Sequence, residues 1–158
     1  MKKWLFLIIF CIIVVILFVV MNTFISKTYE NNYFGKLGIN KYRYTYGNAI
    51  RDFGSPQSTT IASNGCLTIE YDDFSMMFWS NNEDATLMNV KLFSDYYRFG
   101  TKSIGVGSSK KDVLKAYQGV KRSPDKTKYE YIDGNVRVEF VFTKEGVVSS
   151  VILCNGIL

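Results

Sequence analysis

Residues 129–142 read YEYIDGNVRVEFVF and carry the clearest structural signal in the chain. On both sides of Asp133-Gly134, apolar residues alternate with other residues, which is the pattern of a strand that buries one face. Asp-Gly between two alternating segments is a strong signal for a hairpin. The stretch therefore predicts two antiparallel strands, and the Glu145-Gly146 turn predicts a third strand at 147–154.

The N-terminal half contains a similar set of segments. Three short strands are predicted there, at 67–71, 74–79 and 88–93. A helix is predicted over 40–53, where apolar residues form one stripe, and it ends at Gly54-Ser55-Pro56. Residues 57–65 are rich in Ser and Thr and are predicted to form a loop. A second helix is predicted over 110–118, after Ser108-Ser109 as its N-cap.

The order of one helix and three strands thus occurs twice, which indicates an internal repeat. Leu37-Gly38-Ile39 before the first helix resembles Ile104-Gly105-Val106 before the second. Each three-stranded unit has an apolar face to bury, and joining the two units buries both faces. We expect an α+β fold in which two tandem α-β-β-β repeats, 37–99 and 100–158, form one antiparallel sheet with the helices on one face.

Two motifs accompany the repeat, namely the run GVGSSKKDVL at 105–114 and the Gly54-Ser55-Pro56 stop. With these motifs, the repeat resembles the tandem fold of β-lactamase-inhibitor proteins (BLIP-like proteins). The same unit, in a single copy, occurs in the SmpA/OmlA outer-membrane assembly lipoproteins. The resemblance covers about residues 36–155. It implies a binding scaffold whose exposed sheet face docks onto another protein, and it transfers no inhibitory residue and no disulfide pattern.

Residues 4–21 form an apolar run without charge, Gly or Pro, and they follow Lys2-Lys3. As a helix this run would be about 27 Å long, close to the ~30 Å of a bilayer core. The run predicts a retained signal-anchor, with 1–26 as cytoplasmic tip and transmembrane helix and 27–36 as a stalk. The two lysines place the N-terminus in the cytoplasm and the remaining chain outside. The alternative is a cleaved signal peptide, which has a shorter apolar region.

The composition excludes several classes of function. The chain has no histidine, which removes histidine-dependent catalysis and histidine metal sites. Its 19 Lys and Arg are interspersed among 14 Asp and Glu, so no nucleic-acid surface is predicted. Glu70 and Asp72-Asp73 could suggest a catalytic pair or a calcium site, but their spacing is more typical of a turn. We expect no enzyme, no cofactor and no metal.

Two cysteines, Cys66 and Cys154, lie outside the apolar run. They are too few for a zinc site made of thiolates. Outside the cytosol they could form a disulfide between the two halves, and the alternative is two buried thiols. The sequence leaves both alternatives open.

Aromatic residues make up 16% of the chain, more than a core of this size needs. In the second half, the outward positions of the middle strand carry Arg137 and Glu139, as expected beside water. The matching positions of the first half carry Met77 and Trp79. The predicted partner-binding residues are Met77, Trp79, Phe93, Tyr96, Tyr97 and Phe99. The alternative is that the segment between the two halves packs over this face.

These observations predict a membrane-anchored, extracytoplasmic and non-catalytic protein-binding domain of a bacterial cell envelope. Its expected contacts are the lipid bilayer, through 4–21, and an unidentified envelope protein on the open sheet face. Two further hypotheses are a sensor that binds a small molecule or glycan, and an accessory subunit of a membrane complex.

Overall fold

The structure is a computed structural model that describes residues 14–15, 33–39, 43–100, 102–124 and 127–155. The chain divides into two units, Met1–Asn32 and Tyr33–Leu158. In the first unit only Val14 and Val15 are described, and both are helical and exposed. The sheet and the candidate site belong to the second unit.

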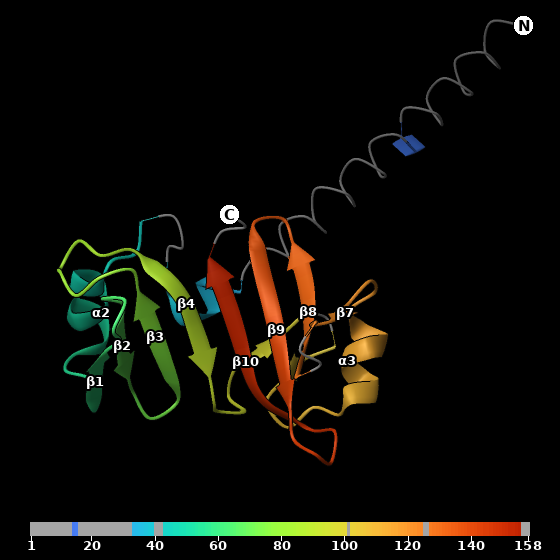
Figure 1. The fold of residues 1–158 in the computed structure, drawn as a ribbon. Coiled ribbons are helices and arrows are strands. Elements are labelled where there is room, and N and C mark those ends of the chain that lie inside the picture. The colour runs from blue at the N-terminus through green and yellow to red at the C-terminus, as the bar shows by residue number, and fades with distance from the viewer. Residues whose placement is uncertain (1–13, 16–32, 40–42, 101, 125–126, 156–158) are drawn as a thin grey trace, which may run out of the picture. The chain divides into compact units, whose positions relative to one another are not determined.

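An antiparallel sheet of eight strands forms most of the second unit (Figure 1). The strands are β1 (Ser58–Ile61), β2 (Leu67–Glu70), β3 (Phe74–Phe78), β4 (Leu87–Leu92), β7 (Lys121–Arg122), β8 (Lys128–Asp133), β9 (Val136–Phe142) and β10 (Val148–Asn155). Their order is β1-β2-β3-β4-β10-β9-β8-β7, so β1 and β7 are the two edges. The two halves of the sequence meet at the centre, where β4 pairs with β10.

Alternation along the strands buries one face of the sheet. Ile69, Met76, Val90, Val138 and Val151 lie on this face, and each is 0% exposed. Because side chains of a strand alternate between the two faces, their neighbours in sequence form a second face, which we call the open face. The buried face forms the hydrophobic core of the unit.

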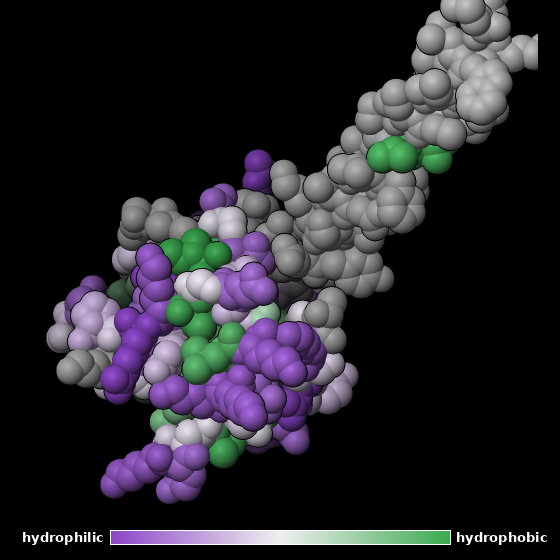
Figure 2. Space-filling view, turned by 90° about the vertical axis from the view of Figure 1, so that its right-hand side faces the viewer, coloured by the Kyte–Doolittle hydropathy of each residue, from purple (hydrophilic) through white to green (hydrophobic). Residues whose placement is uncertain are grey.

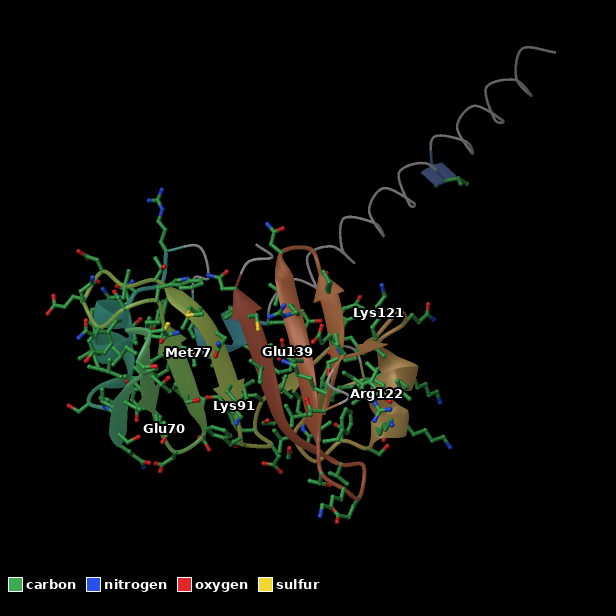
Figure 3. All side chains as sticks on the ribbon, viewed as in Figure 1. Glu70, Met77, Lys91, Lys121, Arg122 and Glu139 are labelled. Atoms are coloured by element: carbon green, nitrogen blue, oxygen red, sulfur yellow. The ribbon has the colours of Figure 1, made fainter. Side chains whose placement is uncertain are left out.

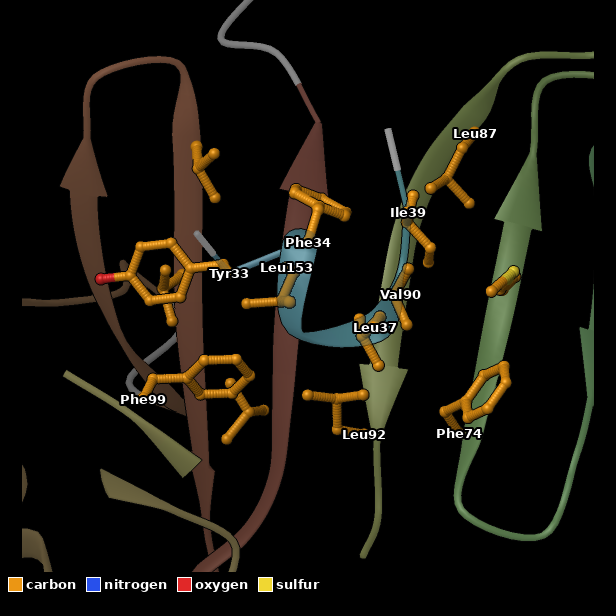
Figure 4. Close-up of a cluster of buried hydrophobic side chains, with 14 of the residues drawn as sticks. Tyr33, Phe34, Leu37, Ile39, Phe74, Leu87, Val90, Leu92, Phe99 and Leu153 are labelled. Carbon is orange, nitrogen blue, oxygen red and sulfur yellow. The ribbon is translucent and has the colours of Figure 1, made fainter. Parts of the chain in front are cut away.

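A short 3-10 helix, η1 (Gly35–Leu37), covers the middle of the buried face (Figure 4). Tyr33 and Phe34 pack beside Phe99 and Leu153, and all four are at most 5% exposed. The folded unit therefore begins at Tyr33, within the predicted stalk at 27–36. The rest of that predicted stalk lies outside the described residues.

Two short α-helices pack on the same buried face. In α2 (Tyr46–Phe53) the ring of Tyr46 lies 5.7 Å from that of Phe78. In α3 (Lys110–Ala116) the C-cap residue Tyr117 lies 5.0 Å from Phe140. The side chains of Thr45 and Ser109 accept hydrogen bonds from the first-turn amides of the two helices, which fixes where each helix begins.

A separate two-stranded sheet joins the two halves. It consists of β5 (Arg98–Phe99) and β6 (Ile104–Gly105). A Cβ atom at Gly105 would overlap the carbonyl oxygen of Tyr97, so only glycine fits there. The Gly-Val-Gly run predicted to lead into the second helix therefore begins inside a strand.

The predicted fold class is wrong. The second unit is mostly an eight-stranded antiparallel sheet with two short helices, and it is not made of α-β-β-β repeats. The predicted loop at 57–65 contains β1, whose four residues are all exposed and so show no apolar alternation. The strands β5, β6 and β7 have two residues each, which is too short for any period to be read. The first helix begins at Tyr46, not at residue 40.

The predicted single-pass membrane topology, with its signal-anchor, is also corrected. Among the residues that the structure describes, no helix is long and apolar enough to cross a membrane. The run at 4–21, on which that prediction depended, lies outside the described residues except for Val14 and Val15.

Candidate functional site: the open face of the sheet

The open face can be read as rows of side chains that run across the strands (Figure 3). One row crosses all eight strands and consists of Lys121, Glu130, Glu139, Ile152, Lys91, Ser75, Glu70 and Ser58. The next row consists of Ile132, Arg137, Cys154, Asn89, Met77, Thr68 and Thr60. The face is mixed in character, with charge mainly in the first row.

The apolar part of this face lies over β2, β3 and β4. Trp79 follows β3 and is 52% exposed. Met77, two residues earlier on the same face, is half-buried and accepts a contact of 3.7 Å from the Asn89 amide. Thr68 lies opposite Met77 in β2. We call these four residues, Thr68, Met77, Trp79 and Asn89, the Trp79 patch.

A sulfur contact lies beside the Trp79 patch. Cys66 is 6% exposed, and its Sγ lies 3.8 Å from the Sδ of Met88. Met88 is the extra residue of a β-bulge, because Met77 pairs with Asn89 while Phe78 pairs with Leu87. The bulge places a second methionine beside the Trp79 patch, which the alternating pattern of the sequence does not reveal.

Phe93 is exposed at the opposite end of β4. It is 37% exposed, and the Nζ of Lys91 lies 5.2 Å from the centre of its ring. Phe93 is four residues along the strand from Asn89, which corresponds to about 13 Å. Phe93 is therefore a separate cation–π pair and not part of the Trp79 patch.

The other predicted binding residues lie away from the open face. Phe99 is 1% exposed, and its ring lies 5.4 Å from that of Tyr33 in the core. Tyr97 packs against Phe74 on the buried face, with 6.4 Å between ring centres. Tyr96 is 78% exposed and lies against Tyr97. Of the six predicted residues, Met77 and Trp79 lie near one another on the open face, whereas Tyr96 and Tyr97 contact each other away from it.

A buried ion-pair cluster occupies the open face of the second half. Glu139 is 2% exposed. Its two carboxylate oxygens pair with Lys128 Nζ at 2.5 Å and with Arg137 Nε at 2.9 Å. The two cations remain 27% and 45% exposed, so they shield the carboxylate from water. The Lys128–Glu139 pair joins β8 to β9, and the Arg137–Glu139 pair lies within β9.

Cys154 is partly buried and borders this cluster. Its Sγ lies 3.7 Å from Glu139 Oε1 and 3.7 Å from the Arg137 guanidinium. Burial, and next the charge of Glu139, raise the pKa of the Cys154 thiol above its ordinary value. A raised pKa lowers the fraction of thiolate, which is the nucleophilic form.

The possible bridge between Cys66 and Cys154 is not formed in this structure, in which both thiols are free. Cys66 precedes β2 and Cys154 belongs to β10, and two strands lie between these. Three strand spacings amount to about 14 Å, and a disulfide needs Cα atoms within about 7 Å. The thiols cannot reach one another without a change in the sheet.

No group of three metal-ligating side chains is present among the described residues. The carboxylates predicted as a turn, Asp72 and Asp73, lie between β2 and β3 and are exposed.

The two halves of the second unit carry net charges of opposite sign. This difference is not obvious in the sequence, where acidic and basic residues are interspersed. Residues 43–97 contain seven acidic and three basic residues, and 98–158 contain eleven basic and six acidic residues. The side of the unit that carries α3 and β7 faces the viewer in Figure 2, where hydrophilic side chains predominate. The half of the sequence that contains β1 therefore carries a net negative charge, and the half that contains β7 carries a net positive charge.

No family model matches the sequence, and no curated protein matches it. Similar folds occur among solved structures. A DUF4309 family protein (YjgB) from Bacillus subtilis has a TM-score of 0.51 and 19% identity over 75% of this chain and 82% of its own. An extracellular protein containing a SCP domain from Bacillus anthracis has a TM-score of 0.52 and 10% identity over 73% of this chain.

A cysteine-rich secretory protein from Staphylococcus aureus also matches, with a TM-score of 0.49 and 8% identity. This chain spans 44% of each of the last two structures. At such identities the similarity concerns the fold alone. None of these structures links the chain to β-lactamase-inhibitor or SmpA/OmlA proteins, so that resemblance has no support beyond the sequence.

Proposed function

We propose that the second unit is a non-catalytic protein-binding domain that docks a partner protein on the open face of its sheet. The observation that supports this proposal is the exposure of Trp79 beside Met77, on a face that no described residue covers there. Trp79 keeps 52% of its surface exposed although the neighbouring Phe78 is fully buried. Tryptophan is the residue most enriched among the anchors of protein interfaces.

The surroundings of Trp79 fit an interface with a partner. Met77 can adjust its shape to a partner, and Asn89 and Thr68 supply hydrogen-bonding groups at the rim. The sheet beneath is rigid, because Met76, Phe78 and Val90 are each 0% exposed on its other face. A rigid support lowers the cost of ordering the contact residues on binding.

The proposal is tested with two alanine variants of the full chain in a quantitative pull-down from the native cells. Trp79→Ala removes the anchor, and Ile132→Ala is the control, because Ile132 is 57% exposed on the same face in the other half. We expect the first variant to lose captured partner at least about tenfold, as for a central interface residue. Equal capture by both variants and the wild type would exclude the Trp79 patch as the docking surface.

A further inference from the structure

The two edges of the sheet differ in how they are protected against pairing with another strand. The β7 edge has two residues, Lys121 and Arg122, and Pro124 follows shortly after. Short length, charge and proline are the features by which proteins protect an edge. The β1 edge has four residues, Ser58–Ile61, with neither charge nor proline. The sheet is thus protected at β7 and open at β1.

Among the strands that the structure describes, β1 pairs on one side only, with β2. At the end of the β1–β2 ladder, the amide of Ala62 donates to the carbonyl of Cys66 at 2.9 Å. In an antiparallel pair, residues that bond across the ladder alternate with residues that do not. The backbone groups of Thr60 and Ala62 therefore bond with β2. The amides and carbonyls of Thr59 and Ile61 point away from β2. These groups form the pattern that an added strand requires.

The side chains of β1 are exposed on both faces of the sheet. All four residues are exposed, and Ile61 keeps 56% of its apolar surface exposed on the side of the core. On the open face, Ser58 lies opposite Glu70 and donates a hydrogen bond of 2.9 Å to its carboxylate. A strand added beside β1 would thus meet Ile61 on one face and Ser58 on the other, with the Glu70 carboxylate one strand further in β2.

The charge around β1 is acidic. Glu70 is exposed in the neighbouring strand β2. Gln57, the residue before β1, donates a hydrogen bond to the Asp72 carboxylate. Residues 43–97 as a whole carry seven acidic and three basic residues. Two copies that paired through β1 would bring two acidic ends together, which electrostatics disfavours. A basic segment complements the charge of this end.

From these observations we infer that β1 is a second docking site, which binds an extended basic segment of a partner protein as a ninth strand of the sheet. The added strand pairs with the amides and carbonyls of Thr59 and Ile61. It places apolar side chains beside Ile61 and basic side chains on the face of Glu70. This inference is independent of the proposed docking at Trp79, which lies on the face of the sheet and not at its edge.

The probe is a peptide about six residues long, the length of a typical strand, that alternates Lys and Val. Alternation directs Val to the face of Ile61 and Lys to the face of Glu70. The control is a Lys-Pro peptide of equal charge, which lacks half of the amide donors. Binding to the full chain is followed by fluorescence anisotropy, and hydrogen exchange locates the protected amides.

The matched variants are Thr59→Pro and Thr59→Ala. Because the Thr59 amide points away from β2, proline there removes an outward donor without breaking a ladder bond. Thr59→Ala keeps the amide. Should Thr59→Pro prove unfolded by circular dichroism, the comparison of the two peptides on the wild type still decides the question.

We expect the Lys-Val peptide to slow exchange at Thr59 and Ile61 by at least about tenfold, at peptide concentrations of about 1 mM. Binding falls at least about tenfold for Thr59→Pro and for the Lys-Pro peptide, and is kept in Thr59→Ala and in Trp79→Ala. The inference would be overturned if the Lys-Val peptide did not bind, or if it bound equally well to folded Thr59→Pro. It would also be overturned if the peptide slowed amide exchange only away from β1. Self-association of the wild type that Thr59→Pro abolishes would also overturn it, in favour of a second copy.

Discussion

Replacing Glu139 by glutamine is expected to destabilise the second unit markedly, although the change lies on the open face. The carboxylate is 2% exposed and pairs with both Lys128 and Arg137. Glutamine keeps the shape of the side chain but loses the negative charge. Its NH2 group, which can only donate, then faces one of the two cations, which are also donors. A hydrogen bond to a charged group contributes about 1.5–3 kcal/mol, so two such bonds set an upper limit near 6 kcal/mol.

The cations regain water when the carboxylate is lost, because they are 27% and 45% exposed. This reduces the expected loss of unfolding free energy to about 2 kcal/mol. For a unit that spans Tyr33–Leu158, that loss lowers the melting temperature by about 8 °C. Thermal unfolding of the full chain, followed by circular dichroism at neutral pH, measures the shift.

The control for this experiment is Glu130→Gln. Glu130 lies directly opposite Glu139 in β8, where two like charges repel. It forms no ion pair with any residue that the structure describes. The charges of Lys128 and Arg137 attract the Glu130 carboxylate and oppose this repulsion. The replacement of Glu130 is therefore expected to change the melting temperature by much less than Glu139→Gln does. Loss of less than about 0.5 kcal/mol in Glu139→Gln would refute the view that the cluster stabilises the sheet.

Three further predictions concern single sites. Burial and the charge of Glu139 raise the pKa of the Cys154 thiol, so we expect this thiol to be alkylated at least about tenfold more slowly in the folded than in the unfolded chain. Mass spectrometry over time measures the rate of alkylation, and equal rates in the two states would contradict the prediction. Burial raises the pKa of Tyr117 to about 12 and also raises that of Tyr33. Because these phenols keep their protons in the folded state, their contribution to stability is full below about pH 10 and is lost as the pH rises toward the pKa of Tyr117. Denaturant unfolding at several alkaline pH values measures this loss, and an unfolding free energy that does not change with alkaline pH would contradict the prediction. Gly105→Ala places a Cβ atom against the Tyr97 carbonyl and is expected to lower the free energy of unfolding by about 2 kcal/mol or more. Urea unfolding measures this loss, and an unchanged midpoint would show that β6 can shift to make room.

The sequence allowed the central strands to be predicted, because each buries alternate residues. Val136, Val138 and Phe140 in β9, for example, are all at most 1% exposed and stand between outward residues. It did not reveal the edges. The four residues of β1 are all exposed, and β7 has only two residues, so neither carries a periodic signal.

The candidate site was predictable in part. Trp79 and Met77 were found because they stand where the second half carries outward charged residues. Phe99 was misassigned, because its burial depends on Tyr33 and on β5, a strand too short to be read from the sequence. Glu139 was predicted to face water, and its burial depends on Lys128, which lies eleven residues away in the neighbouring strand. Contacts between distant segments decided each of these outcomes.

Site-specific photo-crosslinking in living cells tests whether a partner protein docks on the open face at Trp79. An aromatic photoreactive amino acid, which keeps a ring at the anchor position, replaces Trp79 in one variant and Ile132 in another, since both positions are more than half exposed. We expect one protein to be captured from position 79 and not from position 132. Capture from both positions alike, or from position 132 alone, would exclude docking at Trp79.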